Sequence, residues 1–327
     1  MRIFFYLLIL SIFCSCAGTK TGPDYVFPSK KSKVKYLQSY ENSLALWDLA
    51  YEEVDVPTSF GSAHVIISGP KNGDPLVLLH GTDASSTMWF PNVKAFAQTH
   101  RVYAIDYPLE AGKSVANTHK MSNKQVSKFY KEVFDHFKMK NISVAGVSRG
   151  GWVATYIAMQ PENNITKLVL LSPARTFSGV KSMGKVASAL RLKHFPSRRN
   201  SDRFFANFSH NPEGIDAIFQ TQLYYAYKYA KSKPRVMKMY RFKKKQLEKL
   251  NMPVLVLVGD HDIVNDETMF DKIHDVLPNA TTLVVEDAGH FLSIDQRNVV
   301  NKIVTDFINK KPIEQLSLPD PAPVTIN

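Results

Sequence analysis

Cysteine is nearly absent from this chain of 327 residues, in which only Cys14 and Cys16 occur. The rest of the chain therefore has no thiol for a disulfide or a thiolate metal cluster, and its stability must come from core packing. Acidic residues are outnumbered, with 29 Asp and Glu against 41 Lys and Arg, which gives a formal net charge of +12. Hydrophobic residues at 44% and charged residues at 21% are near globular averages, which excludes a long disordered chain. The length suits one large core, with or without an inserted lid.

The apolar run near the amino terminus is too short to cross a bilayer, because residues 3–13 fall well below the roughly 20 residues that a spanning helix needs. Its length and the small residues that follow it are typical of an export signal. Residues 13–16 resemble the lipobox of bacterial lipoproteins, in which the cysteine receives a fatty acyl chain such as palmitate and becomes the first mature residue. The resemblance implies a signal peptide at 1–16, a lipid on Cys16 and a protein held at a membrane of the bacterial cell envelope. Ordinary cleavage near Ala17 without a lipid is the alternative, and both predict export.

Both ends of the remaining chain are predicted to lie outside the folded domain. Residues 17–45 are polar and rich in lysine, so we expect them to form a tether. Residues 313–327 carry Pro319, Pro321 and Pro323, which prevent a helix, so we expect a C-terminal tail there.

The middle of the chain alternates short apolar runs with longer amphipathic stretches, which is typical of a largely parallel sheet flanked by helices. Strands are expected at 52–56, 63–68, 76–79, 102–105, 142–145, 167–171, 254–258 and 281–285, with a hairpin between the first two. Helices are expected at 87–98, 122–137, 150–159, 266–276 and 293–309. Residues 175–250 lack a buried-strand pattern, and we predict that they form an inserted helical subdomain.

A candidate nucleophile follows the apolar run at 142–145. Residues 146–150 read Gly-Val-Ser-Arg-Gly, and they stand between a strand pattern and a helix pattern. The two glycines permit a sharp turn that would present the hydroxyl of Ser148 at the end of the strand. A serine hydroxyl needs a base within hydrogen-bond reach and a carboxylate that orients the base. Acids follow the strand pattern at 254–258, and His290 follows the next one, so the chain order is Ser, Asp, His.

From about residue 54 to residue 309 the chain therefore resembles the α/β-hydrolase enzymes that carry a cap. The resemblance implies an α/β fold: a mostly parallel, eight-stranded sheet flanked by helices, with a helical cap inserted after the sixth strand. The core would comprise 46–174 and 251–312, and the cap 175–250. Because a serine stands at 148, the chain does not resemble haloalkane dehalogenases and epoxide hydrolases, which place Asp there.

The family's patterns also assign the remaining site residues. Residues 259–262 resemble the family's G-[DE]-x-D, which makes Asp262 the triad acid and Asp260 its competitor, and residues 289–290 match the family's G-H, which makes His290 the base. His80-Gly81-Thr82 resembles the family's H-G-x, so the backbone N–H groups of Thr82 and Arg149 would form the oxyanion hole.

Three neighbouring features stay open at this stage. His80 itself is interpreted as structural. Asp83 is expected to cap the following helix, because a carboxylate that pointed inward would oppose an oxyanion. Residues 106–114 resemble the family's loop after the fourth strand, with Leu109 where a glycine is common.

The cap carries the charge of the chain. Residues 175–250 hold 18 Lys and Arg against 4 Asp and Glu, a local charge of +14, so the rest is near neutral. This basic surface could meet anionic lipid, attract an anionic substrate or simply be solvated. Nucleic acid is not expected as a partner, because residues 243–245 form only a short lysine run without a binding motif.

The sequence thus predicts a serine hydrolase that cleaves small-molecule carboxylic esters through Ser148, His290 and Asp262, without a metal or cofactor. Amide, lactone or carbon–carbon bond hydrolysis on the same triad is the nearest alternative. A catalytically silent envelope binding protein is the alternative outside enzymes. The oligomeric state stays open.

Overall fold

The computed structural model describes residues 26–231 and 238–310. The predicted signal peptide, Cys16 and the C-terminal tail lie outside the described residues, as does a short piece of the predicted cap. Among the described residues, no helix combines the length and the apolar character needed to cross a membrane.

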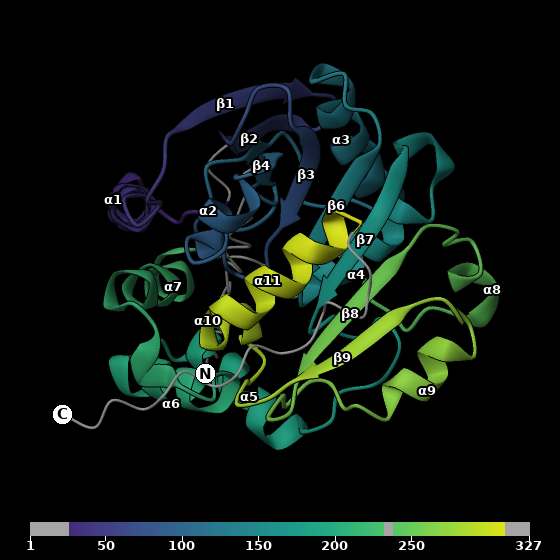
Figure 1. Cartoon of the computed structure of the whole chain (residues 1–327). Coiled ribbons are helices and arrows are strands. Elements are labelled where there is room, and N and C mark those ends of the chain that lie inside the picture. Colours follow the sequence, from purple (N-terminus) through teal and green to yellow (C-terminus); the bar gives the residue numbers. More distant parts are fainter. Residues whose placement is uncertain (1–25, 232–237, 311–327) are drawn as a thin grey trace, which may run out of the picture.

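One twisted sheet runs through the molecule (Figure 1). In spatial order its strands are β1 (Tyr51–Thr58), β2 (Gly61–Ser68), β4 (His100–Ile105), β3 (Asp74–Leu79), β6 (Ile142–Val147), β7 (Ile165–Leu171), β8 (Val254–Gly259) and β9 (Thr281–Val285), and β5 (Val115–Ala116) pairs with β2. β2 is antiparallel to β1, β4 and β5, and the pairs from β4 to β9 are parallel. The predicted mostly parallel sheet and its opening hairpin are confirmed. The strand that the sequence missed is β5, because two residues give no readable pattern.

The central strands read as continuous apolar runs because helices cover both faces of the sheet. Every residue of β6 and β8 is buried. α2 (Val93–Phe96), α10 (Leu292–Asp295) and α11 (Arg297–Ile308) pack on one face, and α3 (Asn123–His136), α4 (Arg149–Ala158) and α9 (Met269–His274) on the other.

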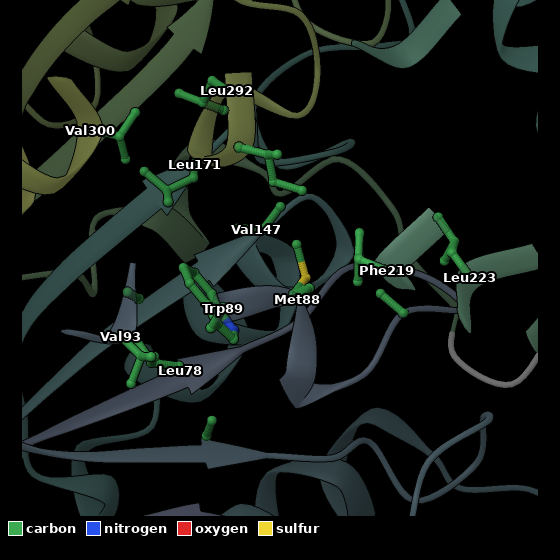
Figure 2. Close-up of a cluster of buried hydrophobic side chains, with 14 of the residues drawn as sticks. Leu78, Met88, Trp89, Val93, Val147, Leu171, Phe219, Leu223, Leu292 and Val300 are labelled. Carbon is green, nitrogen blue, oxygen red and sulfur yellow. The ribbon is translucent and has the colours of Figure 1, made fainter. Parts of the chain in front are cut away.

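The apolar core on the α11 face fixes the strand ends that matter for the site. Figure 2 shows Leu78, Val147 and Leu171 from three neighbouring strands, with Leu171 near Leu292 and Val300 from α10 and α11, and Leu78 beside Val93 from α2. Val147 is 1% exposed, so the residue that precedes Ser148 is fixed in the core.

Three predicted helices differ from the structure at their bounds. The expected helix at 87–98 is divided into η1 (Ser86–Trp89) and α2, because Pro91 between them has no N–H to continue the helix. The expected helix at 293–309 is divided into α10 and α11 at Gln296. The one expected at 266–276 is shorter and forms α9.

Between β7 and β8 the described residues form helices and no strand, as expected for the cap. These elements are α5 (Met183–His194), α6 (Arg198–Phe208), η3 (Pro212–Gly214), α7 (Ala217–Tyr229) and α8 (Lys244–Leu247), and the core adds η2 (Pro161–Asn163). Phe204 and Phe208 are buried, stack with ring centroids 4.5 Å apart and both contact the ring of Phe291, so these cap aromatics join the cap to the core on the α11 face.

The prediction of a tether at 17–45 is wrong for the residues that the structure describes. Residues 30–44 form α1 (Lys30–Leu44), with Ser29 capping its first turn. Tyr36, Tyr40 and Leu44 are at most 1% exposed and belong to the core on the α11 face. α1 also packs along α7. The apolar residues recur every fourth position, so they share one helix face, and the four lysines of the helix all precede Tyr36.

Candidate active site

Ser148 lies on a strained turn between β6 and α4. Its backbone has φ 52° and ψ −115°, a conformation that a residue with a side chain rarely adopts. Glycine is required on both sides, because a Cβ on Gly146 would stand 2.3 Å from the carbonyl oxygen of Gly150, and one on Gly150 would stand 2.1 Å from that of Leu79. The tight turn leaves the Ser148 side chain at the carboxyl end of β6.

His290 and Asp262 meet Ser148 at this edge of the sheet. The Nε2 atom of His290 lies 2.9 Å from Oγ of Ser148, and its Nδ1 atom lies 2.9 Å from Oδ1 of Asp262. Ser148 follows β6, Asp262 follows β8 and His290 follows β9, so the carboxyl ends of three parallel strands bring together residues that are far apart in sequence. His290 is 2% exposed and Asp262 is 1% exposed, so the chain of hydrogen bonds is shielded from solvent.

The two candidate acids, Asp260 and Asp262, accept hydrogen bonds from different parts of the site. Asp260 accepts hydrogen bonds from the backbone N–H groups of Asp287 and Ala288, which fixes the loop that precedes His290. Asp262 accepts hydrogen bonds from Asn265 and from the N–H of Val264. Burial alone would raise the pKa of Asp262, but the His290 ring and these hydrogen bonds hold it below its usual value. Asp262 is thus kept ionised beside the histidine.

The loop after β3 lies against the Ser148 turn. A Cβ on Gly81 would stand 3.7 Å from Cβ of Ser148, so Thr82 follows a residue that touches the candidate nucleophile. Arg149 is the first residue of α4, where backbone N–H groups have no partner within the helix. Both amides predicted for the oxyanion hole therefore come from segments next to Ser148.

His80 holds this loop in place. Its Nε2 atom accepts a hydrogen bond from the N–H of Tyr107, and its Nδ1 atom lies 2.8 Å from the carbonyl oxygen of Gly81. Burial and the nearby Arg149 lower the pKa of His80 to about 4, which keeps the ring neutral, as these two contacts require. This agrees with the structural interpretation of His80.

Four charged side chains that sequence analysis did not connect form a second cluster beside Ser148, which we call the elbow network: Asp83, Glu110, Arg149 and Lys193. Arg149 pairs with Glu110 at 2.8 Å, and Lys193 of α5 pairs with Asp83 at 3.1 Å. Glu110 also accepts a hydrogen bond from the N–H of Asp83, which joins the two pairs. Asp83, Glu110 and Arg149 are each no more than 6% exposed.

The expectation that Asp83 caps the following helix is wrong. The cap of η1 is Ser85, and the Asp83 carboxylate faces Lys193 instead. The signal that could have revealed the network is Glu110 beside Leu109, at the point where the loop departs from the family pattern. Its partner Arg149 is 39 positions away, so no local pattern joins them.

Burial raises the pKa of Glu110 to about 7, against the opposing effect of Arg149 and with a further rise from Asp83. Glu110 is one of the residues that line a cavity of about 400 Å³, together with His64, Lys113 and Ser114.

The cap is joined to the site by aromatic and polar contacts. The ring of Phe208 at the end of α6 lies 5.5 Å from that of His290, centroid to centroid. Gln222 of α7 accepts a hydrogen bond from Thr87 and donates one to Ser85, both in the segment after the Thr82 loop.

In the part of the chain that the structure describes, no cluster of three or more His, Cys, Asp or Glu could hold a metal ion.

Several known proteins are similar to this chain in sequence or in fold. The sequence model described as the Alpha/beta hydrolase family matches residues 76–303. Carboxylesterase YbfK of Bacillus subtilis (strain 168) is 29% identical over 291 residues, which cover 86% of this chain and 96% of that protein. The uncharacterized carboxylesterase nap of the same strain is 29% identical over 284 residues, 84% of this chain and 93% of that protein. The crystal structure of naproxen esterase (carboxylesterase NP) from Bacillus subtilis has a TM-score of 0.81 at 28% identity and covers 86% of this chain and 99% of its own.

Proposed function

The chain belongs to the alpha/beta hydrolase family, and on that premise we propose that it is a serine carboxylesterase whose triad is Ser148, His290 and Asp262. The observation that carries the proposal is the buried chain of hydrogen bonds from Asp262 through His290 to Ser148. Relatives named as carboxylesterases over nearly their whole length support the ester as the bond that is cleaved.

In the proposed reaction, Oγ of Ser148 attacks the ester carbonyl carbon while Nε2 of His290 takes the hydroxyl proton. Asp262 orients the ring and stabilises the imidazolium. The tetrahedral intermediate then collapses, the C–O bond to the alcohol breaks, and His290 returns the proton to the leaving alcohol. Water, deprotonated by His290, attacks the acyl-enzyme and releases the carboxylic acid, which restores Ser148.

The backbone N–H groups of Thr82 and Arg149 are proposed to hold the oxyanion. Their positions beside Ser148 support this role, since donors fixed before the reaction need no reorganisation when the charge develops. The loss of one such donor typically lowers kcat by about 10²–10³-fold.

The proposal is tested with p-nitrophenyl esters of increasing acyl length. We expect the wild-type chain to turn them over and Ser148→Ala to lose the activity. Ser127→Ala is the matched control, because Ser127 is a buried serine of α3 outside the site and its hydroxyl is not needed for the reaction. Equal rates in wild type and Ser148→Ala would end the proposal for these substrates.

A fluorophosphonate probe separates the remaining alternatives. An activated Ser148 reacts with the probe whatever its substrate, so labelling without ester turnover would point to an amide, lactone or carbon–carbon bond. Failure to label the folded protein would instead favour the silent binding protein.

We also propose that the chain is exported and lipid-anchored through Cys16, on the lipobox-like sequence at 13–16. Metabolic labelling with palmitate in a bacterial host tests this. Wild type should take up label and Cys16→Ser should not, whereas Cys14→Ser should behave as wild type.

A further inference from the structure

α5 lies between the two loops that carry the site. At its start, the backbone N–H groups of Lys181 and Ser182 donate to the carbonyl oxygens of Val264 and Ile263, just after Asp262. Near its end, Lys193 pairs with Asp83, just after Thr82. The helix therefore contacts the acid loop through backbone hydrogen bonds at one end and the oxyanion loop through an ion pair at the other.

The outward face of α5 carries exposed apolar side chains, with the exposed His194 in line with them at the C-terminal end of the helix. Met183 is 68% exposed and Leu190 is 53% exposed, and they lie seven positions apart on one side of the helix, with exposed Ala187 between them. Phe195, which directly follows the helix, is 72% exposed. We call these four residues the α5 stripe.

The charge around the α5 stripe has one sign. Residues 175–200 contain seven basic residues and no Asp or Glu. They are Arg175, Lys181, Lys185, Arg191, Lys193, Arg198 and Arg199, and all but Lys193 are exposed. Exposed apolar side chains set among unopposed cations are the combination that an anionic lipid surface accepts, since headgroups attract the cations and the boundary of the acyl chains takes the apolar groups.

We propose that this face of α5 docks on an anionic lipid bilayer, with Met183, Leu190 and Phe195 entering the headgroup region and the flanking cations contacting lipid phosphates. A second copy of the chain is a poorer occupant, because a two-fold interface would set the same basic patch against itself. The α5 stripe contains none of the proposed catalytic residues, so its docking does not depend on which bond the site cleaves.

The test reads the position of α5 directly, because the apolar run at residues 3–13 could hold the full chain on vesicles by itself. In a Cys14→Ser, Cys16→Ser background, Ala187→Cys carries an environment-sensitive dye on the α5 stripe. Lys138→Cys carries the same dye on the exposed loop after α3 as the control. We expect vesicles of phosphatidylcholine with phosphatidylglycerol to blue-shift the dye at 187 and to leave the dye at 138 unchanged, with a weaker response in high salt.

Two variant pairs separate the apolar and the charge contributions. Leu190→Gln with Phe195→Gln should raise the lipid concentration at half-response about tenfold, because two partly exposed apolar groups no longer leave water. Lys185→Gln with Arg191→Gln should raise it by a similar factor on phosphatidylglycerol vesicles at low salt. The matched controls, Val34→Gln with Ile218→Gln and Lys30→Gln with Lys31→Gln, change exposed residues elsewhere and should leave it unchanged.

Circular dichroism and turnover of a soluble ester check that each variant is folded. Equal shifts at 187 and 138 would overturn the proposal, because the chain would then bind without a preference for α5. No shift at either position would also overturn it, because α5 would then not enter the headgroup region. A shift at 187 with polyglutamate but not with vesicles would also overturn it and would assign the surface to an acidic protein.

Discussion

The triad and the elbow network are neighbours, because Ser148 belongs to one and the adjacent Arg149 to the other. The pKa values of their buried carboxylates are shifted in opposite directions. In the triad, the pKa of Asp262 is held below its usual value. In the elbow network, the pKa of Glu110 is raised to about 7. Both carboxylates are nearly inaccessible to solvent, so burial is not the difference between them.

The two pKa shifts differ in direction because Asp262 shares its hydrogen-bond donors with no other carboxylate, whereas Glu110 lies near a second one. Asp262 receives the His290 ring and two neutral donors, with no competing acid among the causes of its shift. Glu110 faces Arg149, but the carboxylate of Asp83 lies close enough to oppose its ionisation. A buried carboxylate with its own donors stays charged, whereas carboxylates that share cations become titratable near neutral pH. Asp262 therefore stays charged in the pH range in which Glu110 titrates.

The largest expected effect is that of breaking the triad. Asp262→Asn should lower kcat by about 10⁴-fold, because the amide favours the wrong tautomer of His290 and cannot stabilise the imidazolium. Ester turnover at saturating substrate measures this. Asp260→Asn is the control, and in folded protein it should stay within about tenfold of wild type if its carboxylate only orders the loop. If Asp260→Asn lowered kcat more than Asp262→Asn, then Asp260 would be the triad acid and Asp262 the residue that orders the loop.

Removing a member of the elbow network should mainly lower the stability of the protein. Arg149→Met should lower the free energy of unfolding by about 3 kcal/mol, because Glu110 loses its buried partner and must either stay charged without it or take up a proton that the unfolded chain has released at this pH. Adding Glu110→Gln should recover part of this loss, since the amide oxygen can still accept from the N–H of Asp83. Urea unfolding near pH 8 measures both. A similar loss in Lys131→Met, which breaks an exposed pair with Asp135 on α3, would show that the buried position is not what matters, because such pairs contribute about 0.5 kcal/mol or less.

The pH dependence of stability distinguishes the two carboxylates. The folded-state pKa of Glu110 is raised from 4.5 to about 7, so the protein binds a proton there that the unfolded chain has released. The resulting stabilisation is complete below pH 4.5 and is lost as the pH rises through about 7. For Asp262 the sign is opposite, and its contribution is lost only as the pH falls below the usual value of 3.8. The difference in unfolding free energy between wild type and Glu110→Gln should therefore change between pH 4.5 and 7, and a flat difference would contradict the raised pKa.

The same contrast explains what the sequence could predict. Ser148, Asp262 and His290 each follow a strand within a short local pattern, so their order along the chain indicated a triad, and the resemblance of residues 259–262 to the family pattern selected Asp262 over Asp260. Glu110 and Lys193 reach the site from a loop and from the cap, and only the folded chain brings them beside Arg149 and Asp83. α1 was missed for a different reason. Its core-facing residues keep a helical period, but the lysines that precede them at residues 30–35 dominate the composition on which the tether was predicted.

The smallest expected effect comes from the cap's contribution to the elbow network. Lys193 is one of the groups that lower the pKa of Glu110, and its side chain is partly exposed. Lys193→Met should therefore cost only about 1 kcal/mol of unfolding free energy, but it should move the midpoint of the Glu110 titration to higher pH. Repeating the comparison with Glu110→Gln in the Lys193→Met background measures this midpoint. Lys185→Met, on the same helix and exposed, removes an equal charge without facing Asp83, so it should leave the midpoint in place. If both variants moved it equally, the basic surface of the cap as a whole, rather than the contact between Lys193 and Asp83, would set the charge of Glu110.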